Sequence, residues 1–173
     1  DVDNANLASL TVKVASNSVE SGDELVLGAA VIDLMDTSSN TGEVTYGTGS
    51  TVFGYTVTDN GSDRIVTFES LAGSGGSASA VAKADYEALL DALEFNNSSD
   101  DFTDNSSRVF SVVANDGSTD SAAATFTVTM DVTNDTPTIS LTDGSPAFIE
   151  VDGDSGVTTN AVVINNSIAL EDL

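Results

Sequence analysis

The chain has 173 residues with a hydrophobic fraction of 40%, which is enough for a real core. Its 28 Asp and Glu residues against four Lys and Arg give a formal net charge of -24, which repels nucleic-acid phosphates and anionic membrane surfaces. Cysteine, histidine and tryptophan are absent, which excludes disulfides and argues against zinc sites and Ser-His chemistry. No apolar run approaches the roughly 20 residues that span a bilayer, so we expect no membrane insertion.

An alternation with period two dominates the chain and predicts half-buried strands. The first such segment, "LASLTVKVA", places Leu10, Val12 and Val14 on one face. Segments rich in Val, Phe, Tyr and Thr follow in order: "DELVLGA", "TVFGYTVT", "DRIVTFESL", "SRVFSVVAN" and "AAATFTVTMDV". In the last of them the inward face is expected to carry Phe126, Val128 and Met130.

Turn residues bound these segments. The clusters "TDNGSD" at 58–63 and "ANDGSTD" at 114–120 contain Asn-Gly and Asp-Gly pairs, which accept positive φ and favour tight hairpins. We expect the polar side chains of these clusters to hydrogen-bond the backbone, namely those of Asp59, Asn60, Asp63 and Asp116. Short strands with frequent turns predict an antiparallel all-β sandwich.

One segment, at about residues 82–94, breaks this rhythm and predicts a short helix. Its apolar residues recur at spacings of three and four: Ala82, Tyr86, Leu89, Leu90 and Leu93. We expect the helix to plug one end of the sandwich. The preceding Gly- and Ser-rich residues 71–80 are typical of a flexible crossover, and they lack the Gly-Lys-Ser/Thr ending of a phosphate-binding loop.

Residues 83–139 resemble the second half of the cadherin-like, immunoglobulin-like β-sandwich repeats of large bacterial RTX-type surface adhesins. The motif residues are Tyr86, Leu90, Leu93, Phe95, Asn97, Arg108, the "NDG" hairpin at 115–117, Asn134, Asp135 and Pro137. The opening "DVDNANLASLTVKV" is similar to a strand opening of the same family. The resemblance implies an Ig-like or cadherin-like sandwich.

The same resemblance implies two parts, a body at residues 1–136 and the opening strands of a repeat at residues 137–173. Joined end to front, the chain reads "ALEDLDVDNANLASLTV", as one family-like passage. We expect residues 137–173 to complete the sandwich of their own chain, as in a circularly permuted repeat. The alternatives are strand exchange with a neighbouring molecule and a repeat split around an inserted module, because open β edges tend to find partners.

Oxygen-bearing side chains cluster near this boundary, and calcium takes six to eight oxygen ligands. The segment "DVTND" offers Asp131, Asn134 and Asp135, and "FIEVDGD" offers Glu150, Asp152 and Asp154. The resemblance implies calcium at the junction between repeats, and Asp1, Asp3, Glu171 and Asp172 join the set if the termini meet. The loop "DDFTDN" at 100–105 is equally well a second calcium loop or a solvated one. The acidity as a whole can also serve solubility alone.

These features predict a calcium-stabilised extender or split repeat of an adhesin, secreted or at the bacterial cell surface, with neighbouring repeats as partners. The alternative is a module that itself binds a surface ligand such as a sugar or peptide, for which the loops at 34–49 and 71–80 offer the only places. We expect no enzyme activity, because paired acids without tryptophan offer little platform for a sugar ring.

Overall fold

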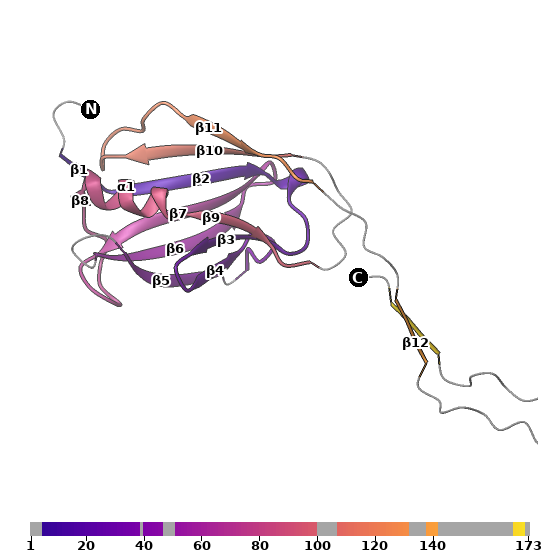
Figure 1. Cartoon of the computed structure of the whole chain (residues 1–173). Helices are drawn as coiled ribbons and strands as arrows, with labels where there is room; N and C mark the ends of the chain where they lie inside the picture. Colours follow the sequence, from indigo (N-terminus) through magenta and orange to yellow (C-terminus); the bar gives the residue numbers. More distant parts are fainter. Residues whose placement is uncertain are drawn as a thin grey trace, which may run out of the picture. The chain divides into compact units, whose positions relative to one another are not determined.

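In the computed structural model the chain divides into two compact units, Asp1–Val132 and Thr133–Leu173. The structure describes residues 5–38, 40–46, 51–99 and 107–131, together with the backbone of residues 138–141 and 168–171. The first unit contains two main sheets and a helix (Figure 1). Within the described ranges no helix has the length and apolar character needed to cross a membrane.

A six-stranded antiparallel sheet forms the larger layer of the first unit. The strand order is β11-β10-β2-β7-β6-β5, so β11 and β5 are its two edges. The strands are β2 (Ser9–Ala15), β5 (Thr41–Tyr46), β6 (Thr51–Asp59), β7 (Asp63–Leu71), β10 (Arg108–Asn115) and β11 (Ala124–Val128).

A three-stranded antiparallel sheet and the helix form the second layer. The order β4-β3-β9 joins Ala30–Asp33, Asp23–Leu27 and Glu94–Asn97. The remaining elements of this unit are the ladder of β1 (Asn6–Leu7) with β8 (Val81–Ala82), the 3-10 turn η1 (Ser16–Ser18) and the helix α1 (Lys83–Asp91).

The two layers share one apolar core. The ring centroids of Phe95 on β9 and Phe110 on β10 lie 5.8 Å apart, and those of Tyr86 on α1 and Phe53 on β6 lie 5.0 Å apart. The small sheet and the helix therefore cover one face of the large sheet (Figure 1). Burial of each such side chain contributes about 1.5–3 kcal/mol of transfer free energy.

The predicted all-β sandwich with a single helix is confirmed. Leu10, Val12 and Val14 are buried, as their alternation in the sequence indicated. The two hairpins form at the expected places, with φ of 88° at Gly61 and 98° at Gly117. The other predicted strand segments correspond to β3, β6, β7, β10 and β11.

The helix is shorter than predicted, because it ends at Asp91 and strand β9 begins at Glu94. Tyr86 and Leu89 are its buried residues, whereas Leu90 keeps 37% of its surface exposed. Ala82, expected on the apolar face, is exposed and caps the helix at its N-terminus. The helix therefore contacts the core through a narrower face than its apolar spacing indicated.

The predicted loop at 34–49 is wrong in its centre, because β5 occupies Thr41–Tyr46 and pairs with β6. Glu43 on β5 also binds the crossover after β7. Its carboxylate accepts hydrogen bonds from the Ser74 hydroxyl at 2.5 Å and from the Gly75 N–H at 2.7 Å. The Ser74 bond, followed by that of Gly75, lowers the pKa of Glu43.

The second unit contains one described ladder. Strands β12 (Thr138–Leu141) and β13 (Ile168–Glu171) pair antiparallel, with Thr138 opposite Glu171 and Leu141 opposite Ile168. The expectation that residues 137–173 complete the sandwich of their own chain, or pair with a neighbouring molecule, stays a prediction.

Candidate functional site

Two of the ten predicted calcium ligands lie in the described part of the chain. Asp131 is exposed and follows β11 by three residues, and Glu171 is the last residue of β13. The others lie outside the described residues: Asp1, Asp3, Asn134, Asp135, Glu150, Asp152, Asp154 and Asp172. The predicted acidic loop at 100–105 lies there too. The boundary calcium site therefore stays a prediction.

Within the described ranges, no three His, Cys, Asp or Glu side chains form a group that could hold a metal ion. Three of the four turn residues expected to hydrogen-bond the backbone do so. Asp59 accepts from the Gly61 N–H at 2.7 Å, Asn60 from the N–H of Ser62 and Asp63, and Asp116 from those of Ser118 and Thr119. These oxygens organise hairpins, as the sequence predicted.

The pKa of Asp59 is lowered, first by the Gly61 N–H and then by the Ser16 hydroxyl. Arg64 adds an ion pair with the same carboxylate. Because these donors favour the charged form, the Asp59 carboxylate stays ionised to lower pH than an isolated aspartate would.

A buried ion pair joins the two sheets. Arg108 opens β10 and Asp23 opens β3, and both side chains are fully buried. The Arg108 Nε atom donates to Asp23 Oδ2 at 2.7 Å, and the Glu20 N–H donates to the same oxygen at 2.9 Å. Asn97 on β9 donates its amide to Asp23 Oδ1 at 2.7 Å. The Asp23 carboxylate therefore links β3 and β9 of the small sheet to β10 of the large sheet.

Sequence analysis identified Arg108 only as a family motif residue and did not identify Asp23. The available signal was weak: Arg108 is one of only four basic residues in a strongly acidic chain. A cation at the start of an apolar strand needs a buried partner, but the partner is 85 residues away along the chain.

Tyr86 forms a second buried polar connection. Its hydroxyl donates to the Ala8 carbonyl at 2.7 Å and accepts from the Ser70 N–H at 3.0 Å. Burial raises the pKa of Tyr86. The helix is thus attached to the segments that precede β2 and end β7, which is a structural role.

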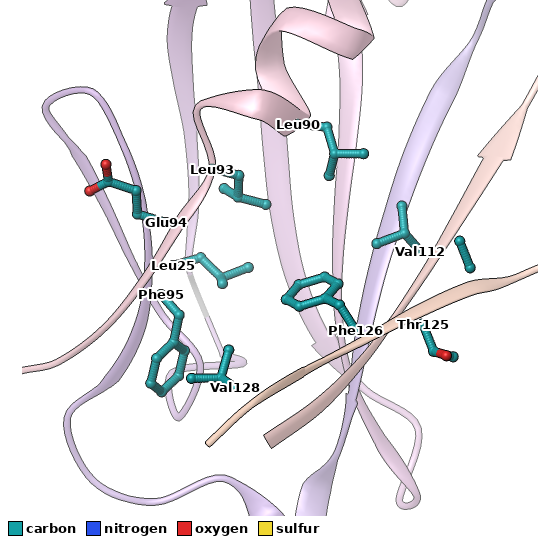
Figure 2. Close-up of a pocket in the computed structure, with 10 residues that line it drawn as sticks. Leu25, Leu90, Leu93, Glu94, Phe95, Val112, Thr125, Phe126 and Val128 are labelled. Atoms are coloured by element: carbon teal, nitrogen blue, oxygen red, sulfur yellow. The ribbon is translucent and has the colours of Figure 1, made fainter. Parts of the chain in front are cut away.

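An apolar groove of about 530 Å³ opens on the described part of the first unit. Figure 2 shows side chains of the helix and small sheet on one wall and of the large sheet on the other. The lining residues are Leu25, Leu90, Leu93, Glu94, Phe95, Val112, Ala124, Thr125, Phe126 and Val128. Concave sites lined mainly by apolar groups are the usual form of ligand sites in proteins.

Three phenylalanines pack beside the groove, and one of them keeps part of its surface exposed there. Phe95 of the small sheet packs on Phe110, and Phe110 stacks on its neighbour Phe126 at 5.0 Å between centroids. Phe126, which was expected to point inward from β11, keeps 43% of its surface exposed. In the described part of the chain, β9 is the edge of the small sheet and β11 is the edge of the large sheet, and the groove lies between residues of these two strands.

Together these features define an antiparallel all-β, sandwich-like protein whose second layer is narrower than its first. Comparisons with protein-family models, with curated proteins and with solved structures found no match.

Proposed function

We propose that this chain is a calcium-stabilised structural repeat, of the extender or split kind, from a bacterial surface adhesin. In this role it projects or positions a ligand-binding module and is secreted or displayed at the cell surface. Its partners are the neighbouring repeats of the same adhesin. The fold class supports the proposal, because a two-layer sandwich cross-linked by a buried ion pair suits a stiff spacer.

The observation that carries the proposal is the position of Asp131 at the end of the first unit, directly before further oxygen-bearing residues of the sequence. Asp23 is committed to Arg108, and Asp59 and Asp116 are committed to turns. Asp131 is exposed next to the end of that unit at Val132, and Asn134 and Asp135 follow it in sequence. Acids concentrated at a joint repel each other unless a cation neutralises them.

Calcium would supply that neutralisation at the joint. Asp131, Asn134 and Asp135 would provide oxygens from the linker, and Glu150, Asp152 and Asp154 would provide them from the segment that follows. Glu171, Asp172, Asp1 and Asp3 are the further candidates. Bound calcium would restrict the motion of one unit against the next and stiffen an array of repeats.

Thermal unfolding in a calcium titration tests this proposal. We expect the midpoint to rise with calcium concentration, with about 2.7 kcal/mol of stabilisation at 100 times the dissociation constant. Sodium chloride of equal ionic strength should produce only part of this rise. A calcium response no larger than that of sodium chloride would overturn the calcium role.

A pair of variants places the effect at the joint. Asn134→Ala combined with Asp135→Asn should reduce the calcium response, because it removes two ligands. The matched control is Asp91→Asn, which removes an exposed acid at the end of α1 and should leave the response intact. If the two variants respond equally to calcium, the calcium site does not lie at the joint.

The alternative function, a module that itself binds a surface ligand, has one observation in its favour. The apolar groove lies between β9 and β11 and not at either of the loops expected to carry recognition.

A further inference from the structure

The groove lies between two sheet edges. Strand β9 is the edge of the three-stranded sheet and β11 is the edge of the six-stranded sheet. Among the described residues, β9 pairs only with β3 and β11 only with β10. One side of β9 therefore carries backbone N–H and C=O groups that can accept another strand.

The gap beside β9 has the position of one missing strand. Phe95 of β9 packs on Phe110 of β10, and it lines the groove together with Phe126 and Val128 of β11. A strand added to the free edge of β9, at the usual spacing of about 4.8 Å, would enter the groove that residues of β9 and β11 line. Its inward side chains would meet Phe126 and Val128 and cover Leu90. An extended chain with an apolar residue at every second position satisfies this geometry.

The outer face of the small sheet indicates which residues an added strand should carry at its outward positions. Glu94 and Asn96 are the outward residues of β9, and both are exposed. Glu24 of β3 is opposite Asn96, and Asp33 of β4 is opposite Glu24. The outer face thus carries three acids.

None of the four basic residues of the chain belongs to this sheet: they are Lys13, Arg64, Lys83 and Arg108. An added strand would place its outward side chains beside Glu94 and Asn96. Lysine or arginine there would form favourable cross-strand pairs, and an acid would be repelled.

We propose that the groove binds an extended peptide segment of a partner protein in which large apolar residues alternate with Lys or Arg. The segment pairs with the free edge of β9 and extends the small sheet from three strands to four. Its apolar side chains fill the groove above Phe126, and its basic side chains face the acidic outer surface. Backbone pairing supplies affinity and alternate side chains supply selectivity, as in other cases of β-strand addition.

The basic residues of the proposed partner distinguish it from the C-terminal part of this chain. Residues 138–171 contain no Lys or Arg. A segment from a second copy would therefore place neutral or acidic residues beside Glu94. The inference goes beyond the proposed structural role and does not depend on calcium.

Calorimetry with the full chain and synthetic peptides tests the proposal. The probe is the acetylated heptapeptide Lys-Val-Lys-Phe-Lys-Val-Lys. One control replaces every Lys by Glu, and a second keeps the composition but groups the apolar residues together. We expect binding of the probe, in calcium and in chelator alike, and at least roughly tenfold weaker binding of both controls.

Variants assign the binding to the groove. Leu90→Asn and Phe126→Thr replace exposed apolar residues of the groove and should each weaken binding roughly tenfold. The matched control is Val109→Asn, because Val109 is 53% exposed on β10 and does not line the groove. Glu94→Lys should weaken binding by about two- to fivefold, the size of one cross-strand charge pair. Unchanged urea midpoints would show that each variant folds.

Several results would overturn the proposal. These are absence of probe binding, equal binding of the Glu peptide, and equal losses for Val109→Asn and Leu90→Asn. A peptide of residues 145–152 of this chain, "SPAFIEVD", provides a further arm. Tighter binding of that peptide than of the basic probe would assign the groove to the chain's own sequence and reject a basic partner.

Discussion

Arg108 has its entire side chain buried, and its interaction with Asp23 is the clearest single-residue link between the two sheets. The sequence predicted the residues that act locally, such as Asp59, Asn60 and Asp116, because their partners are two or three positions away. It could not predict the Asp23 interaction, because nothing in a local pattern distinguishes that acid from its neighbours. Long-range polar pairs are decided by how the sheets pack.

Replacing Arg108 with methionine should destabilise the protein by about 3–5 kcal/mol, because the Asp23 carboxylate would stay buried without its cation. Urea unfolding at neutral pH measures this loss. Lys83→Met is the control, since Lys83 pairs with Glu87 on the surface of α1 and its loss should cost less than about 1 kcal/mol. Adding Asp23→Asn to Arg108→Met should recover part of the stability. Similar costs for the two single variants would contradict a structural role for the buried pair.

At the scale of elements, strands with clear alternation were predictable, including the edge strand β11, whereas β4 and β5 were not. β2 has three buried apolar residues in strict alternation, whereas β5 reads "TGEVTY" and alternates exposed with half-buried residues. No residue of the edge strand β5 is buried, so its apolar signal in the sequence is weaker. The end of α1 was also hard to predict from the sequence. Phe95 reaches Phe110 in the core from strand β9 and not from a longer helix.

The turn before β3 depends on a close approach that the sequence alone does not reveal. Gly22 has φ of 84°, and a Cβ there would lie 2.6 Å from the Ser99 backbone nitrogen. Gly28 has φ of 62° with nothing within 4 Å of its Cβ position. Gly28→Ala should therefore cost only the left-handed penalty of about 1–2 kcal/mol, and Gly22→Ala should cost clearly more. Urea midpoints of the two variants measure the difference, and equal midpoints would contradict the contact at Ser99.

At the scale of the whole molecule, a net charge of -24 sets a strong self-repulsion against the compact state. Raising sodium chloride from 0.01 M to 0.15 M shortens the Debye length from about 30 Å to about 8 Å. The thermal midpoint should therefore rise, by about 2–4 °C for each kcal/mol of repulsion removed. Choline chloride at the same concentrations should act equally, because screening depends on charge and not on ion identity. A constant or falling midpoint would show that the acids are already compensated.

The sequence alone determined the class of fold, the buried face of β2, the hairpins and the acidic surface. Each of these depends on residues close together in the chain, through alternation, turn geometry or simple charge count. The tertiary structure alone decided the Asp23–Arg108 pair, the edge position of β5 and the open groove above Phe126. These features arise where two sheets of unequal width pack against each other. The local sequence pattern of one sheet does not encode the width of the other.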